Sequence, residues 1–220
     1  MKETDIKRVF RENNRLFSEN LNSCKEIKVY GEKLIKHKGK ELRSWNPYRS
    51  KLAAAILSGL IKINISYNSQ ILYLGAATGT TVSHFSDIAK DGIVYAVENS
   101  PIAVKDLLQL SKKRENLVPI MSDANHPDRY NKIVPPVDFL YQDISQRNQT
   151  EIFIINISRY LKIDGQGIIM VKARSIDVSI KPKKVYEHVI NELRKNKLMI
   201  VDSIDISHYE KDHAAIVVSV

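Results

Sequence analysis

Apolar runs and helix-period segments alternate along most of this chain, beginning near residue 70. Short runs rich in Ile, Val, Leu and Tyr predict buried strands, and the segments between them carry apolar residues at helical spacing. Ser100 and Pro101 provide an N-cap and a first-turn proline for one of these helices. The predicted strands are 70–75, 92–98, 117–123, 137–143 and 167–173, and the predicted helices are 81–90, 100–114, 150–162 and 181–197. This alternation is typical of a parallel sheet covered by helices.

The end of the chain departs from the alternation. Two predicted strands, 198–207 and 214–220, are separated by the short segment HYEKDH. A parallel connection needs about a dozen residues or more, so this pair is predicted to be antiparallel. The predicted fold class is therefore α/β, a doubly wound sheet of parallel strands with one reversed strand near its end.

The first 44 residues have a different pattern. Short alternating pieces are separated by Gly31 and Gly39, which predicts a small antiparallel sheet. A helix is expected over 48–63, where Ala, Leu and Ile form a helical stripe. We therefore expect two domains, a mainly β module over 1–47 and an α/β domain over 48–220.

Charge is concentrated at the amino-terminal end. The net charge of the 220-residue chain is +9, and residues 1–51 hold 14 Lys and Arg against 7 Asp and Glu. A basic surface of this kind favours a polyanionic partner such as nucleic acid, although basic surfaces also occur without one. The single cysteine, Cys24, excludes an intrachain disulfide, and no apolar run reaches the roughly 18 residues of a membrane span. These features, with a charged N-terminus, are those expected of a soluble intracellular protein.

Each predicted parallel strand ends with a polar or small residue, or has one next to its end, at the edge where such sheets bind ligands. These residues are Gly75, Glu98, Asp123, Asp143 and Lys172. The turn GAATGTT lacks the lysine of a triphosphate loop, and its glycines are four residues apart, a partial match to a dinucleotide fingerprint.

Glu98, about 20 residues after the turn, suits the two hydroxyls of a ribose. Asp123 and the small Ala124 suit an adenine ring. The pattern indicates an adenosine ligand without a pyrophosphate, of which S-adenosylmethionine is the most common. The alternative is that the glycines serve only to pack the strand against the helix.

Several segments resemble the fibrillarin family in its compact archaeal form, in the family's order and from about residue 30 to the end. The segments are RSWNPYRSKLAAAI, YLGAATGTTVSH, YAVENS, SDANHP, QDISQ, VKARSID and YEKDHA. The resemblance implies a Rossmann-like methyltransferase sheet and methylation of ribose 2′-hydroxyls in rRNA or tRNA, with S-adenosylmethionine as the cofactor. It implies a box C/D guide RNA, a Nop-family scaffold protein and a kink-turn-binding protein as partners. An archaeal-type protein is expected in the cytoplasm.

The same resemblance implies the residues of the site. Its cofactor contacts are Gly75, Ala77, Thr80, Thr81, Glu98, Asn99, Asp123, Ala124, Asp143, Ile144, Ser145 and Gln146. Asn99 replaces an aromatic residue that usually follows the ribose acid, and Arg147 replaces a proline. The thiol, imidazole and carboxyl groups show no metal-ligand spacing, so no metal is expected.

The family's catalytic Lys-Asp-Lys-His set corresponds to Lys51, Asp143, Lys172 and His213. A ribose hydroxyl is a weak nucleophile until its proton is drawn away, and Lys172 suits that task either as a base or as a charge that stabilises the alkoxide. Considered in isolation, these residues also fit ordinary structural roles: Lys51 as a surface lysine, Asp143 as a helix cap and His213 as a turn residue.

Arg43, Arg49 and Arg174 are expected to contact RNA phosphates, together with the lysines of KPKK at 181–184. Trp45 fits a core or interface anchor. The remaining histidines considered, His84, His126, His188 and His208, are interpreted as structural. A non-catalytic RNA-particle subunit with a vestigial cofactor fold is the main alternative, and the complete catalytic set argues against it. A small-molecule or dinucleotide enzyme is disfavoured by the missing G-x-G-x-x-G motif and by the basic N-terminal module.

Overall fold

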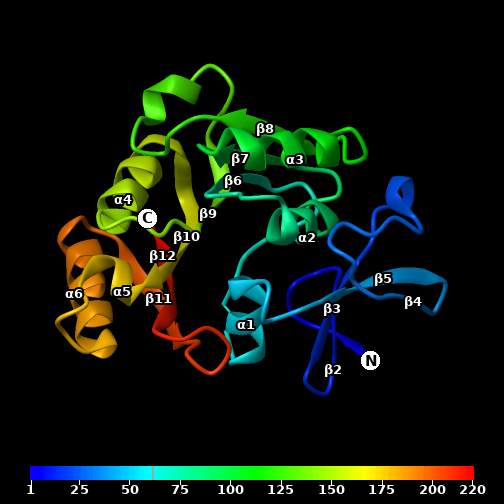
Figure 1. The fold of residues 1–220 in the computed structure, drawn as a ribbon, viewed down its shortest axis with the longest axis horizontal. Helices are drawn as coiled ribbons and strands as arrows, with labels where there is room; N and C mark the ends of the chain where they lie inside the picture. Colours follow the sequence, from blue (N-terminus) through cyan, green and yellow to red (C-terminus); the bar gives the residue numbers. More distant parts are fainter. Residues whose placement is uncertain (61) are drawn as a thin grey trace.

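The computed structural model describes residues 1–220 with the exception of residue 61. It contains a seven-stranded sheet, in the order β11-β12-β10-β9-β6-β7-β8, and a five-stranded sheet at the N-terminus (Figure 1). The strands of the large sheet are β6 (Gln70–Leu74), β7 (Ile93–Glu98), β8 (Leu117–Met121), β9 (Val137–Gln142), β10 (Leu161–Lys172), β11 (Met199–Asp205) and β12 (His213–Ser219). The helices are α1 (Lys51–Leu57), α2 (Thr80–Ile88), α3 (Pro101–Ser111), α4 (Gln149–Tyr160), α5 (Ala173–Ile176) and α6 (Pro182–Lys195), with 3-10 turns η1 (Asn22–Cys24) and η2 (Pro127–Tyr130).

The topology confirms the predicted mixed sheet. Strands β10, β9, β6, β7 and β8 pair in parallel, whereas β12 runs antiparallel to both of its neighbours, β10 and β11. Because β12 is reversed, its first residue, His213, lies at the edge of the sheet where the parallel strands end. The last strand of the chain is therefore inserted inside the sheet, and β11 forms its edge.

Period-two alternation distributes the strand side chains between two hydrophobic layers. In β6, Ile71 and Tyr73 belong to the layer that includes residues of α1, α2 and α3, while Leu72 and Leu74 belong to the layer beneath α4 and α6. Both layers are closely buried, as expected for a doubly covered sheet whose strands are apolar on both faces. Val185, Val189 and Leu193 of α6 lie in the second layer.

The N-terminal residues form the expected antiparallel sheet. Its order is β1-β2-β3-β5-β4, with strands β1 (Lys2–Glu3), β2 (Val9–Glu12), β3 (Arg15–Glu19), β4 (Leu34–His37) and β5 (Lys40–Trp45). One face of this sheet, including Val9, Leu16 and Trp45, belongs to the same buried cluster as α1 and α2. The two sheets therefore share a hydrophobic core, although the first ends at Trp45 and the second begins only at Gln70.

Two predicted helix boundaries are corrected. The helix expected over 48–63 covers only Lys51–Leu57, with Ser50 as its N-cap, and Gly59 at φ +110° follows its end; residue 61 of that range lies outside the described residues. The helix expected to reach residue 162 ends at Tyr160, and β10 begins at once. Asp164 and Gly165 lie within β10, where its pairing with β9 shifts in register between Leu161 and Gln166.

None of the helices in the described part of the chain combines the length and the apolar character that crossing a membrane requires.

Candidate active site

The glycine turn after β6 places backbone close to two neighbouring elements. Gly75 has φ +80°, and a Cβ there would collide with the backbone carbonyl of Asp143, which follows β9. Gly79 has φ +93°, and a Cβ there would lie 2.6 Å from Leu110 Cδ2 of α3. Gly75 therefore permits a close approach at the strand ends, whereas Gly79 serves the packing of α2 against α3.

The acid at the end of β7 holds this turn in place. Glu98 Oε2 accepts a hydrogen bond from the backbone N–H of Ala77 at 2.8 Å, and Oε1 accepts from the N–H groups of Asn99 and Ser100 at 2.9 and 2.8 Å. A carboxylate has about four acceptor positions, so one position on Oε2 is left for a further donor such as a ribose hydroxyl.

The loop after β8 is anchored from α4. The amide of the buried Asn156 donates to Ala124 O at 2.9 Å, which fixes the position of the small residue predicted to face an adenine. Asp123 Oδ1 accepts from the backbone and side-chain N–H groups of Asn125, both at 2.9 Å, and these hydrogen bonds lower the pKa of Asp123. Asp123 is therefore an anion whose other oxygen remains available to a ligand.

These strand ends line a cavity of about 300 Å³ that is open to solvent. Among its lining residues, ten were predicted as cofactor contacts: Gly75, Ala77, Glu98, Asn99, Asp123, Ala124, Asp143, Ile144, Ser145 and Gln146. Val97 and Ser122 also line it and were not predicted, although each directly precedes a predicted acid. The Ser122 hydroxyl is buried and has no hydrogen-bond partner among the described residues. A polar ligand in the cavity would satisfy it.

Thr80 and Thr81 are not among the residues that line this cavity, so their cofactor contacts stay a prediction. Both lie in the first turn of α2, directly after Gly79. The Thr81 hydroxyl is buried and donates to Ser50 Oγ at 3.0 Å, and Thr80 lines a separate cavity beside Tyr30 and Arg49.

Ser50 fixes the start of α1 and so the position of Lys51. Its Oγ accepts hydrogen bonds from Trp45 Nε1 at 2.8 Å and from Ala53 N at 3.5 Å, in addition to that from Thr81. Trp45 is buried, which agrees with its expected role as a core anchor. The N-terminal sheet and α2 thus jointly hold the helix end that carries the first catalytic candidate.

The four predicted catalytic residues come together on one face of the sheet. Tyr141, Met170 and Ala215 belong to the layer packed against α1, and the side chains two residues away along each strand share that face. In β10 and β12 these are Lys172 and His213, while Asp143, directly after the end of β9, is placed by its contact with Lys51 at the start of α1. Lys51 Nζ lies 2.8 and 3.0 Å from the two oxygens of Asp143, with both side chains about one-fifth exposed.

Lys172 and His213 are direct cross-strand partners of β10 and β12. His213 Nδ1 lies 2.7 Å from Lys211 O, so Nδ1–H donates to this carbonyl and the neutral ring keeps its lone pair on Nε2. Burial lowers the pKa of His213, and the charge of Lys51 acts in the same direction. The cluster therefore combines two lysines, a paired carboxylate and a neutral imidazole beside the cavity.

Arg43 is a correction to the expected RNA contacts. It is fully buried, with Nε 2.6 Å from Glu32 Oε1, Nη1 2.7 Å from Asp87 Oδ2 and Nη2 2.9 Å from Ser83 Oγ. All three groups of the guanidinium are used inside the protein, so Arg43 joins the N-terminal sheet to α2 rather than binding RNA.

The other two arginines are exposed. Arg49 lies over the ring of Tyr30 at 4.9 Å from its centroid and donates to Tyr30 O. Arg174 is held by Asp212, at 2.9 Å, and by Val178 O. Each retains donors that face solvent. His84, interpreted as structural, is buried and stacked on Trp45 with ring centroids 4.5 Å apart.

The fold is a Rossmann-like α/β sheet with a cavity at the carboxyl ends of its parallel strands. A SAM-dependent methyltransferase from Aquifex aeolicus, 17% identical, superposes with a TM-score of 0.54 over 70% of this chain and 84% of its own. At that identity the likeness concerns the fold alone.

The chain belongs to the fibrillarin family, whose model matches residues 2–220. It is 45% identical over 210 residues to the fibrillarin-like rRNA/tRNA 2′-O-methyltransferase of Methanothermobacter thermautotrophicus, covering 96% of this chain and 93% of the relative. It is 50% identical over 190 residues to that of Methanocaldococcus jannaschii, covering 86% and 83%.

Two solved structures are also similar. Aeropyrum pernix fibrillarin in complex with natively bound S-adenosyl-L-methionine is 40% identical and has a TM-score of 0.85, with 96% of this chain and 92% of that chain covered. A fibrillarin from a fibrillarin/Nop5p complex is 40% identical and has a TM-score of 0.90, with 99% of both chains covered.

Proposed function

We propose that this protein transfers a methyl group from S-adenosylmethionine to ribose 2′-hydroxyls of RNA. The observation that carries the proposal is the arrangement of the Lys51–Asp143 pair, Lys172 and His213 on one face of the sheet, beside a cavity lined by two acids suited to adenosine. The family membership of the chain supports the same activity, because its relatives are named rRNA/tRNA 2′-O-methyltransferases.

The lining of the cavity fits the cofactor. Glu98 keeps an acceptor position for a ribose hydroxyl, Asp123 keeps a free carboxylate oxygen, and the buried Ser122 hydroxyl lacks a protein partner among the described residues. Asp143 is shared between the cavity and the Lys51 pair, so it connects cofactor binding to the catalytic cluster. When bound, S-adenosylmethionine supplies an electrophilic methyl group carried on a sulfonium.

The side chains of the cluster then act on the nucleophile. Lys172 either removes the proton of the 2′-hydroxyl or stabilises the developing alkoxide by its charge. Lys51 orients the Asp143 carboxylate through two short hydrogen bonds. His213, neutral and with its Nε2 lone pair free of the Lys211 carbonyl, is proposed to accept a proton from Lys172, its cross-strand neighbour.

Basic side chains around the cluster are proposed to hold the RNA backbone. They are Arg49, Arg174, Lys181, Lys183 and Lys184, all exposed. Phosphate contacts position a strand without reading its sequence, which agrees with a proposed box C/D guide RNA that selects the target by base pairing. A Nop-family scaffold and a kink-turn-binding protein are proposed as further partners; the fibrillarin/Nop5p complex of a relative supports the first.

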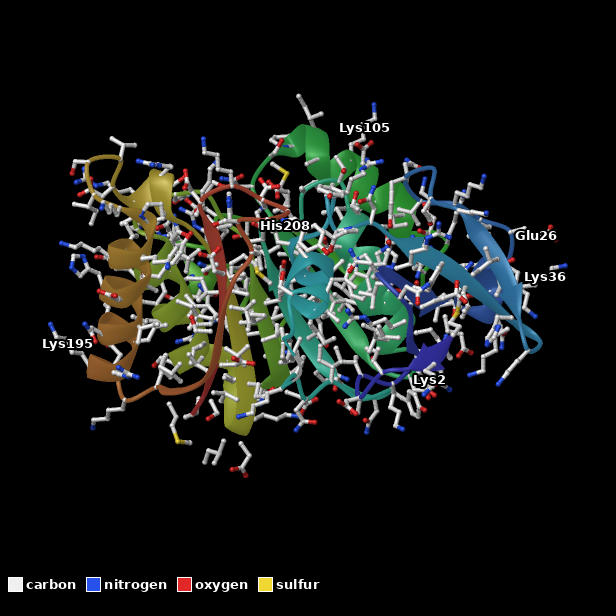
Figure 2. All side chains as sticks on the ribbon, turned by 90° about the horizontal axis from the view of Figure 1, so that it is seen from below. Lys2, Glu26, Lys36, Lys105, Lys195 and His208 are labelled. Atoms are coloured by element: carbon white, nitrogen blue, oxygen red, sulfur yellow. The ribbon has the colours of Figure 1, made fainter. Side chains whose placement is uncertain are left out.

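The proposal is tested by reconstitution with these partners and a guide RNA, followed by mapping of methylated riboses. Lys172→Ala is expected to bind S-adenosylmethionine in calorimetry but to lose methyl transfer. Lys195→Ala is the matched control, because Lys195 lies on α6 at the end of the molecule opposite the N-terminal sheet (Figure 2). Normal turnover of Lys172→Ala would contradict the assigned role, and absent cofactor binding by the unmodified protein would favour a non-catalytic subunit.

A further inference from the structure

The catalytic candidate Lys172 lies in the last part of β10, which extends beyond the end of the neighbouring strand β9. The last residue pair between β9 and β10 joins Gln142 to Ile169, after which β9 ends and the chain turns away at Asp143. Residues 170–172 therefore extend past the last paired position of β9. On the other side, β10 remains paired with β12 as far as Lys172 and His213.

Beyond the end of β9, a glutamine side chain makes the hydrogen bonds that a neighbouring strand would make to β10. Gln149, the first residue of α4, is fully buried, and its Oε1 accepts the backbone N–H of Lys172 at 3.0 Å. Its Nε2 donates to Lys172 O at 3.3 Å and to Gln146 O at 2.9 Å. A single side-chain amide thus satisfies both backbone groups of Lys172, as a neighbouring strand would.

The direction of these hydrogen bonds determines which type of cross-strand pair Lys172 and His213 form. The N–H and C=O of a strand residue leave on the same side, and those of Lys172 point to Gln149. Lys172 and His213 are therefore a non-hydrogen-bonded pair, the type in which opposite side chains are closest. The hydrogen bond to the connection before β12 is made by the next residue, from Ala173 N to Asp212 O at 3.0 Å.

We propose that Gln149 is a positioning residue, whose amide fixes the backbone of Lys172 so that the lysine meets the target hydroxyl beside His213. This inference rests on the function proposed above. It assigns Gln149 no contact with substrate or cofactor. Its effect reaches the reaction through Lys172, and a displacement of about 1 Å at such a group can cost on the order of a hundredfold in rate.

The loop of residues 143–146, which lines the cofactor cavity, is held by other hydrogen bonds. We expect it to keep its position when the Gln149 amide is removed. Gln146 O also accepts from the backbone N–H of Gln149 at 3.3 Å, and Gln146 Oε1 accepts from Asn125 Nδ2 at 3.0 Å. Gln142 Nε2 donates to the backbone carbonyl of Gln149 at 2.6 Å, which a side-chain substitution leaves in place. Loss of the Gln149 amide should therefore lower the rate of methyl transfer while leaving the affinity for the cofactor nearly unchanged.

The test compares Gln149→Met, which keeps the length of the side chain but cannot form these bonds, with Asn116→Leu. The Asn116 amide donates to the carbonyls of Ser86 and Ala89, both at 2.9 Å, and lies beside the amino end of β8, so it controls for the loss of an inward-facing amide. In the reconstituted particle, Gln149→Met is expected to lower the single-turnover rate at least about tenfold while the dissociation constant of S-adenosylmethionine changes by less than about threefold. Asn116→Leu is expected to keep the rate of the unmodified protein at a temperature where both are folded.

Amide hydrogen exchange provides a readout that does not depend on activity. The N–H of Lys172 should be protected in the unmodified protein and in Asn116→Leu, and should exchange faster in Gln149→Met. A full rate in Gln149→Met, an equal loss of rate in the control, or a loss of cofactor affinity in proportion to rate would each overturn the proposal. Failure of the unmodified particle to methylate RNA would instead refute the proposed function, while the exchange result would still report on the contact itself.

Discussion

The buried guanidinium of Arg43 allows a prediction that separates stability from RNA binding. Arg43→Met removes a positive charge that lies 2.7 Å from Asp87 and 2.6 Å from Glu32, at positions with no more than 1% exposure. Asp87 keeps Arg114 at 2.7 Å, and Glu32 keeps the backbone N–H groups of Val29 and Tyr30. Glu32 thus loses its ion-pair partner, and the main cost falls there.

Breaking a buried ion pair by removing one partner costs about 3–5 kcal/mol. A domain of this size loses roughly 2–4 °C of melting temperature per kcal/mol, so Arg43→Met is expected to lower the melting temperature by roughly 6–20 °C. Because typical free energies of unfolding are only about 5–15 kcal/mol, the variant should remain folded but be markedly less stable.

The assay is thermal and urea unfolding, with RNA binding by the reconstituted particle measured well below the transition. Arg49→Met is the matched control: it removes an exposed arginine and should change the melting temperature by no more than about 2 °C while weakening RNA binding. Adding Glu32→Gln to Arg43→Met should recover part of the lost stability, because no charge is then left without its partner. The reasoning fails if Arg43→Met weakens RNA binding while leaving the melting temperature within about 2 °C of the unmodified protein.

Three further predictions concern pH, the turn and the catalytic pair. Burial, together with the nearby Arg43 and Arg114 charges, lowers the pKa of His84 well below its ordinary value of about 6.5. Below about pH 6.5 the unfolded chain therefore binds a proton that the folded protein does not, and the free energy of unfolding should fall as the pH drops. Urea midpoints between pH 5 and 8 measure this slope, which His84→Gln should reduce; an unchanged slope would assign it to other groups. Gly75→Ala forces a Cβ into a neighbouring backbone carbonyl and should abolish cofactor binding in calorimetry, whereas measurable binding would show that the strand ends can separate. Lys51→Met should lower turnover about a hundredfold by leaving the carboxylate of the pair unoriented, and retention of half the turnover would refute that role.

Much of the site was predictable because it is set by local pattern. In a parallel sheet, residues that follow the strands gather at one edge whatever the details of packing, so Gly75, Glu98, Asp123 and Asp143 could be placed together from the sequence alone. The reversed strand followed equally from the length of one connection. The family resemblance added Lys51 and His213, whose spacing along the chain carries no signal of its own.

Where the sequence prediction failed, contacts between distant segments decided the outcome. Arg43 reads as a surface charge, and only the packing of α2 against the N-terminal sheet provides Asp87, 44 residues away, to bury it. Thr81, buried in the first turn of α2, likewise donates to Ser50 Oγ, 31 residues away, a contact that no local pattern indicates.

The sequence pattern by itself therefore determined the class of fold, the edge that carries the site and the strand-end residues of its lining, because strand periodicity and strand-end position are local properties. The rest of the predicted lining came from the family resemblance. The tertiary structure decided how the catalytic groups meet. Insertion of β12 beside β10 places His213 opposite Lys172, and the first residue of α4 replaces a missing strand at the same point. Both arrangements join segments at least 23 residues apart. They form because buried backbone groups must be hydrogen-bonded in the folded state, and no local preference of the sequence specifies them.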